Sequence, residues 1–206
     1  MIPDWMASAP LPFDTVLVAN RGEIAVRILR AARESGLRGI AIYSDPDAGS
    51  LHVENADEAV HLPGTSLADT YLNGDAIIEA ARSTGAQAIH PGFGFLSERA
   101  HFANAVKEAG LIWIGPPADA IDTMGDKISA RRCMIESGVP VIPGEEISMG
   151  GDANHLGVLA AAAARVGYPL LLKASAGGGG KGMRAVHEPK ICLLYTSDAA
   201  DDTPCV

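Results

Sequence analysis

The hydrophobic positions of this chain form short apolar runs, and each run follows a longer segment of helical periodicity that ends at a glycine. Five such junctions occur, at Gly36, Gly85, Gly110, Gly138 and Gly167. Glycine closes a helix well because it adopts the left-handed conformation without steric cost. Apolar runs without polar alternation favour strands that are covered on both faces. The pattern therefore predicts an α/β fold with a largely parallel sheet.

The apolar runs and the periodic segments between them predict the individual elements. Strands are expected at residues 15–19, 40–43, 88–90, 112–114, 139–142 and 170–174, with a further strand-like run at 183–186. Helices are expected at residues 23–35, after the N-cap residue Asn73, at 118–137 and at 155–165. The segment 118–137 has Gly125 near its middle, which predicts a helical hairpin or a kinked helix.

A domain boundary is predicted where Ile114 is followed by Gly-Pro-Pro, because two prolines stop any continuation of the preceding strand. Residues 1–13 are then an N-terminal extension, residues 14–115 one doubly wound unit, and residues 116–188 the start of a second domain. Residues 189–206 have no clear periodicity and contain two of the three cysteines. We expect a truncated chain with a non-native tail here, and the alternative is a natural C-terminus.

Composition and charge narrow the class of protein. The chain has 206 residues, of which 48% are hydrophobic and 5% aromatic, an ordinary globular composition. Its net charge of −9 comes without a basic block, which argues against a general nucleic-acid binder. No apolar run approaches the roughly 20 residues of a membrane span, and we expect no membrane association. The first basic residue is Arg21, too late for a signal peptide, and the cysteines have no motif spacing, so a cytoplasmic setting is expected.

The strongest chemical signal is the glycine-rich segment from Lys173 to Arg184, which contains four consecutive glycines. Their N–H groups can point at phosphate oxygens, and lysine adds positive charge. The segment is not a Walker A loop, because Ser175 and Gly182 stand where that motif needs glycine and Ser/Thr. Strand-like runs on both sides suggest a flap over a nucleotide, and the alternative is a simple hairpin. Lys173 ends a very apolar strand, where a snorkelling lysine is the more common case, but its position beside the glycine-rich segment favours phosphate contact.

Two further segments are candidate ligand sites. Asp126 is a possible N-cap that places Lys127 in the first turn of a helix, the poorer end for a cation, and this points weakly to an anionic partner. A surface lysine is the alternative. The loop from Gly92 to Glu98 follows a strand end, where α/β proteins bind ligands. Glu98 could pair with a substrate or simply cap the next helix. The histidines have no metal-ligand spacing.

Taken together, these pieces resemble the biotin carboxylase family, over about residues 14–187 and in an order and spacing that make the resemblance specific. The matching stretches are residues 16–30, 90–98, 114–116, 124–127, 138–140 and 173–184. The sequence looks most like the subunit of a bacterial acetyl- or propionyl-type acyl-CoA carboxylase. Pyruvate carboxylase and urea carboxylase share these motifs.

The resemblance implies a Rossmann-like N-terminal domain followed by an incomplete ATP-grasp domain. It implies ATP- and bicarbonate-dependent carboxylation of biotin on a carrier protein, with ATP, Mg²⁺ and biotin as cofactors or substrates. The expected partners are a biotin carboxyl carrier protein, a carboxyltransferase subunit and, at full length, a second copy in a homodimer. The family's Mg²⁺ ligands and catalytic groups lie beyond the glycine-rich lid and have no counterpart here, so we expect this chain by itself to be inactive.

By motif position, the resemblance also implies roles for individual residues. Lys127 and Lys173 would contact the phosphates or the base of ATP. Gly179 and Gly180 would belong to the lid over the phosphates, and Met183 would lie near the adenine. Gly92, Phe93, Gly94 and Glu98 would line the reaction cleft. Phe93 stands where some relatives have tyrosine, so a role of that hydroxyl is absent. Arg30 and Glu34, an i,i+4 pair, would lie toward the dimer face.

Two alternatives to this function stay open at the level of sequence. One is another ATP-grasp ligase, such as carbamoyl-phosphate synthase or a purine-pathway carboxylase, against which the stretch from His90 to Glu98 argues. The other is a non-catalytic α/β binding module, in which the glycine-rich segment is only a hairpin.

Overall fold

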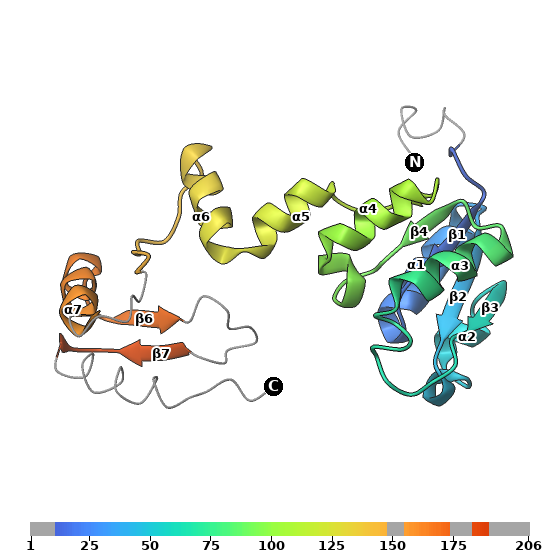
Figure 1. The fold of residues 1–206 in the computed structure, drawn as a ribbon, viewed down its shortest axis with the longest axis horizontal. Helices are drawn as coiled ribbons and strands as arrows, with labels where there is room; N and C mark the ends of the chain where they lie inside the picture. The colour runs from blue at the N-terminus through green and yellow to red at the C-terminus, as the bar shows by residue number, and fades with distance from the viewer. Residues whose placement is uncertain (1–10, 148–154, 174–182, 190–206) are drawn as a thin grey trace. The chain divides into compact units, whose positions relative to one another are not determined.

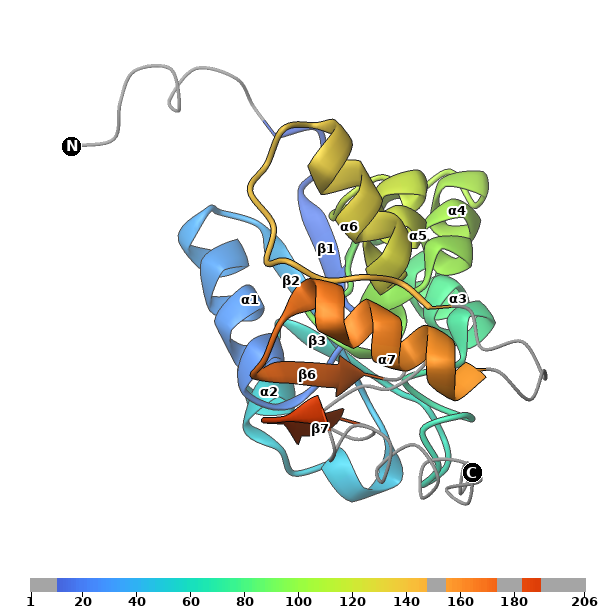
Figure 2. The same ribbon diagram turned by 90° about the vertical axis from the view of Figure 1, so that its left-hand side faces the viewer.

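The computed structural model describes residues 11–147, 155–173 and 183–189 (Figures 1 and 2). The chain divides into two compact units, residues 1–125 and 126–206. Among the described residues, no helix combines the length and the apolar character that a membrane crossing requires.

The first unit is built on a five-stranded parallel sheet with the order β3-β2-β1-β4-β5. Its strands are β1 (Thr15–Val18), β2 (Arg38–Tyr43), β3 (Glu58–His61), β4 (Ala88–His90) and β5 (Ile112–Trp113). Its helices are α1 (Gly22–Glu34), α2 (Leu51–Glu54), α3 (Gly74–Thr84), α4 (Ala100–Glu108) and α5 (Ala118–Gly125), with the 3₁₀ turns η2 (Asp45–Asp47) and η3 (Phe95–Glu98). The predicted α/β fold with a parallel sheet is confirmed.

The central strand β1 is buried along its whole length because helices cover both faces of the sheet. Successive strand residues point to opposite faces. Leu17 accordingly joins the core that α3 and α4 contribute to, whereas Val18 packs with α1 residues such as Ile28 and Leu29. Burial on both faces explains why the run has no polar alternation.

The second unit contains α6 (Lys127–Glu136), α7 (His155–Val166) and the antiparallel pair β6 (Leu170–Lys173) and β7 (Met183–Val186). Figure 1 shows α7 lying beside this pair, and a small apolar cluster of Leu159, Ala163 and Val186 joins them. The strand-like run at 183–186 is therefore a strand, and the glycine-rich segment connects two paired strands, as the flap interpretation requires.

Most predicted boundaries agree with the structure to within a residue or two. All five junction glycines have positive φ, between 72° and 90°. Asn73 caps α3, since its Oδ1 accepts a hydrogen bond from the Ala76 N–H at 3.1 Å. Asp126 caps α6 in the same way through the Ser129 N–H at 2.8 Å, so the segment 118–137 is two helices that are separated at Asp126.

The strand predicted at residues 139–142 is wrong, because that segment has no regular structure. Ile142 is 85% exposed, and its carbonyl accepts a hydrogen bond from the Arg131 guanidinium at 2.7 Å instead of joining a ladder. Prolines at positions 140 and 143 remove two of the N–H groups that a strand would need. Apolar content alone did not reveal this.

The compact units divide after Gly125, and Ile121 of α5 is part of the core of the first unit. The domain boundary at Pro116 stays a prediction. The sequence missed one strand of the first unit. Strand β3 was not predicted, since it is a half-exposed edge strand with charged or polar residues at both ends.

Replacement of Asn73 by alanine tests the cap of α3. We expect Asn73→Ala to lower the free energy of unfolding by about 1 kcal/mol, because the Ala76 N–H loses its acceptor. Asn73→Asp keeps an acceptor oxygen and should change stability much less. Urea denaturation of the three proteins measures the difference, and equal loss in both variants would contradict the capping role.

Candidate functional site at the topological switch point

The strand order reverses at β1, which pairs with β2 on one side and β4 on the other. Connections that leave β1 and β4 at their carboxyl ends therefore diverge, and this point is the usual ligand position in open α/β sheets. Two segments meet there: the turn Asn20–Gly22 after β1, and the loop of residues 91–98 after β4. We call the second segment the switch-point loop.

Asn20 joins these two segments directly. The side chain is almost fully buried, with 3% exposure. Its Nδ2 donates to the carbonyl of Pro91 at 2.7 Å and to that of Phe93 at 3.0 Å, while its Oδ1 accepts from the Arg21 N–H at 2.9 Å. One amide group thus satisfies two carbonyls of the switch-point loop and one N–H of the β1 turn.

Two glycines of the switch-point loop are required by its geometry. Gly92 has φ of +70°, and a Cβ there would lie 2.8 Å from Asn20 Nδ2. Gly94 has φ 67° and ψ −169°, a conformation that is essentially restricted to glycine. Between them, the Phe93 side chain is 63% exposed, and Glu98 at the end of η3 is also exposed. The structure thus gathers the four predicted cleft residues in one loop.

Phe95 is the only described non-glycine residue with positive φ, at 49°. Its ring stacks on Tyr71 at 5.6 Å between centroids, with an angle of 9° between the planes. The Arg21 guanidinium lies 5.3 Å from the Tyr71 ring centre and 5.8 Å from that of Phe95. Such cation–π contacts stabilise the pair electrostatically.

Asp47 is the electrostatic centre of this cluster. It accepts hydrogen bonds from Ser44 Oγ at 2.7 Å, Tyr71 OH at 2.8 Å and Arg21 Nη1 at 3.1 Å. Burial raises the pKa of Asp47, but these hydrogen bonds lower it by more than burial raises it. The pKa of Asp47 is therefore below its ordinary value of 3.8. Burial, together with the bond to Asp47, raises the pKa of Tyr71 to about 12.

His90 supports the switch-point loop from the end of β4. Its Nδ1 accepts a hydrogen bond from the Gly92 N–H at 3.0 Å, which places the ring proton on Nε2 in the neutral form. Burial lowers the pKa of His90 and favours that neutral form. No role was assigned from the sequence to Asn20, Arg21, Asp47 or Tyr71, because each acts through a contact with a distant segment. His90 was also assigned no role, although its contact with Gly92 is local.

The residues predicted to bind ATP belong to the second unit. Lys127 is the first residue of α6. Lys173 ends β6 directly opposite Met183 of β7, whose side chain is 40% exposed. Gly179 and Gly180 lie outside the described residues. The structure therefore brings Lys173 and Met183 together across the strand pair, at the two ends of the glycine-rich segment.

Arg30 and Glu34 pair on the exposed side of α1, as predicted, with 2.8 Å between Nε and Oε1. The hydrogen bond to Glu34 raises the pKa of Arg30. Their role at a dimer face stays a prediction.

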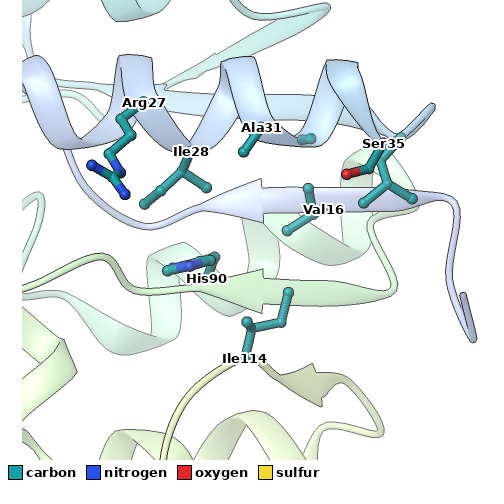
Figure 3. A pocket seen from close by; sticks show the side chains of 9 residues that line it. Val16, Arg27, Ile28, Ala31, Ser35, His90 and Ile114 are labelled. Carbon is teal, nitrogen blue, oxygen red and sulfur yellow. The ribbon is translucent and has the colours of Figure 1, made fainter. Parts of the chain in front are cut away.

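A hollow of about 270 Å³ lies between α1 and the sheet. Figure 3 shows Arg27 and His90 at one end and Ser35 at the other, with Val16, Ile28 and Ile114 between them. Because its lining is mostly apolar, this hollow is better suited to contact with apolar groups than to binding a charged nucleotide. Within the described ranges, no three His, Cys, Asp or Glu side chains lie close enough to hold a metal ion.

Comparison with known proteins identifies the family. The family model described as biotin carboxylase, N-terminal domain, matches residues 12–121, more than half of the chain. The chain belongs to the biotin carboxylase family. A second model, the ATP-binding domain of the carbamoyl-phosphate synthase L chain, matches residues 126–204.

Individual relatives support the assignment of this chain to the biotin carboxylase family. The chain is 51% identical over 177 residues to the alpha subunit of mitochondrial methylcrotonoyl-CoA carboxylase of Oryza sativa, covering 86% of this chain and 24% of the relative. It is also 51% identical over 177 residues to the biotin carboxylase of Halalkalibacterium halodurans, covering 85% and 38%. The chain thus spans between a quarter and two-fifths of the length of these relatives.

A solved structure of the family matches the fold. The biotin carboxylase domain dimer of Hydrogenobacter thermophilus 2-oxoglutarate carboxylase, in complex with MgADP, ADP and bicarbonate, has a TM-score of 0.79 and 42% identity, covering 93% of this chain and 41% of that one. The similarity confirms that the fold is that of the N-terminal part of a biotin carboxylase.

The pH dependence of stability tests the Asp47 cluster. A carboxylate with a lowered pKa in the folded state stabilises the fold above its unfolded pKa, and this contribution is lost as the pH falls through the folded pKa. We expect Asp47→Asn to be less stable than the original chain by about 1 to 2 kcal/mol at pH 7. The difference should shrink as the pH falls below about 4. Denaturation across this pH range measures the difference in free energy of unfolding. A difference that does not depend on pH would contradict the lowered pKa of Asp47 in the folded state.

Proposed function

We propose that this chain is the N-terminal part of an ATP- and bicarbonate-dependent biotin carboxylase that carboxylates biotin on a carrier protein. The observation that carries the proposal is the order of the two matched segments, a biotin carboxylase N-terminal domain followed by an ATP-binding domain. A relative with 42% identity binds MgADP and bicarbonate in its solved structure, which supports the same substrates here.

In the proposed reaction, bicarbonate oxygen attacks the terminal phosphorus of ATP, and ADP leaves with the electrons of the broken P–O bond. The product, carboxyphosphate, transfers its carboxyl group to the ureido nitrogen of biotin. The C–O bond to phosphate breaks, and the ureido N–H proton passes to the inorganic phosphate that leaves. Phosphoryl transfer depends almost entirely on positioning and on stabilisation of charge. Mg²⁺ bound with ATP would neutralise phosphate charge.

The residues available for ATP lie around the β6–β7 pair and at the start of α6. Lys127 and Lys173 would contact the phosphates or the base, Gly179 and Gly180 would belong to a lid, and Met183 would lie near the adenine. The register that places Lys173 opposite Met183 supports this arrangement, since the glycine-rich segment connects the two paired ends.

The reaction cleft would be lined by the switch-point loop, through Gly92, Phe93, Gly94 and Glu98. Because the chain spans only 38% of a biotin carboxylase relative, we expect turnover to need more of the family's length than these residues. A carrier protein, a carboxyltransferase and a second copy would be the partners of the longer protein. The cytoplasmic setting and the acyl-CoA substrate stay predictions, since relatives include a mitochondrial methylcrotonoyl-CoA enzyme.

Titration of Mg-ATP onto the 206-residue chain tests the nucleotide site. We expect a Lys127→Ala/Lys173→Ala double variant to bind Mg-ATP at least about tenfold more weakly, because two cations near the phosphates are lost. The control is Lys107→Ala, which removes an exposed lysine of α4 in the other unit and should bind as the original does. Calorimetry measures the affinity for Mg-ATP. Unchanged binding by the double variant would contradict the assignment of Lys127 and Lys173 to the nucleotide site.

The gene beyond codon 186, read from the source DNA, tests the function as a whole. We expect the frame to continue into a second half of the ATP-binding domain, whose product hydrolyses ATP only when bicarbonate and biotin are both present. Turnover without a need for biotin would favour another ATP-grasp ligase. A stop after codon 206 would instead favour a non-catalytic binding module.

A further inference from the structure

We propose that Asn20 is a positioning residue that sets the conformation of the switch-point loop, with the stack of Arg21 and Tyr71 on Phe95 as the second hold on the same loop. The position of this loop in the reaction cleft rests on the proposed function. The conformational hold itself rests only on the contacts within the first unit.

The first hold depends on the amide chemistry of Asn20. Two carbonyl oxygens, of Pro91 and Phe93, point at one nitrogen that carries two hydrogens, and the neighbouring oxygen takes the Arg21 N–H. A carboxylate in the same place would face two carbonyl oxygens without a proton to donate, and a serine could satisfy only one of them. Because Asn20 is buried, water is not available to replace the lost donors.

The loop needs such a hold because its backbone is strained. Phe95 has positive φ without being glycine, and Gly94 directly before it lies in a glycine-only region. Residues in these regions persist only where the surroundings over-determine them, and they gather at functional sites. An unheld loop would relax to more ordinary backbone angles and would move Phe93 and Glu98.

The second hold acts on the strained residue itself. The Phe95 ring is stacked on Tyr71, and Arg21 lies over both rings. Asp47 in turn fixes Arg21 and Tyr71 through hydrogen bonds at 3.1 and 2.8 Å. The holding residues thus come from the segments after β1, after β2 and before α3, so three separate parts of the unit determine one loop.

Hydrogen exchange of the 206-residue chain tests the hold directly. In Asn20→Asp, we expect the loop amides of Gly92 and Ser97, and the Arg99 amide directly after the loop, to exchange at least about tenfold faster, while amides of α3 keep their rates. The matched control is Asn73→Asp, which preserves the acceptor of a cap on α3 and should leave the loop unchanged. Unchanged loop amides, or equal acceleration throughout the unit, would overturn the proposal.

A double-mutant cycle keeps the test decisive if Asn20→Asp does not fold. Gly92→Ala places a methyl group 2.8 Å from Asn20 Nδ2, in addition to its backbone strain. An Asn20→Ala background removes the contacts with the amide group and leaves only the contact with Cβ of residue 20 at 3.1 Å, so Gly92→Ala should accelerate loop exchange less there than in the original chain. Equal effects in both backgrounds would mean that the contact does not couple the two segments.

Kinetics of the longer carboxylase separate this inference from the proposed function. Asn20→Asp should lower kcat by at least about tenfold and leave the KM for ATP within about twofold, because the proposed ATP residues lie in the other unit. A parallel rise in the KM for ATP would indicate general damage and would overturn positioning. If the original enzyme has no biotin-dependent turnover, the proposed function fails, and hydrogen exchange alone then decides the hold.

Discussion

The parallel pairing of β1 with β2 on one side and β4 on the other is the constraint on which the first unit depends. It buries β1 on both faces and forces the chain to cross to opposite faces of the sheet before and after β3. It also makes the connections after β1 and β4 diverge at one sheet edge. The position of the candidate site is therefore a consequence of strand order, before any particular side chain is considered.

Polar contacts then fix the conformation of the segments at this sheet edge. Asn20 supplies hydrogen bonds that no apolar residue could provide, and Asp47 accepts from a serine, a tyrosine and an arginine that are distant from one another in sequence. Buried polar groups are costly unless they are satisfied, and a satisfied network specifies one conformation. Phe95 is accordingly held at an unusual φ instead of relaxing.

In the proposed reaction, the residues that would line the reaction cleft and those that would bind the nucleotide belong to different units. The switch-point loop belongs to residues 1–125, and the proposed nucleotide residues belong to residues 126–206. The first unit has an extensive core that includes Phe102 and Trp113 in edge-to-face contact at 5.7 Å. Among its described residues, the second has a small cluster of Leu159, Ala163 and Val186, so the larger unit carries most of the described hydrophobic core.

Local sequence signals determined the elements wherever the physics is local. The glycine junctions, the caps at Asn73 and Asp126 and the unalternated run of β1 were all readable, because each depends on neighbours within a turn or on burial of a whole strand. The family motifs around residues 90–98 and 173–184 predicted candidate site segments, and the roles of their residues stay predictions. Apolar content misled at residues 139–142, where prolines and Arg131 prevent strand pairing.

Tertiary structure alone decided which residues hold the site. Asn20 and Pro91 are 71 residues apart, and Asp47 and Tyr71 are 24 apart, so no periodicity or spacing could pair them. The same holds for the assignment of α5 to the first unit, which depends on where Ile121 finds its core. The sequence by itself thus determined most of the elements, the family and the candidate segments. The contacts between distant segments, which depend on strand order and burial, determined the geometry of the site.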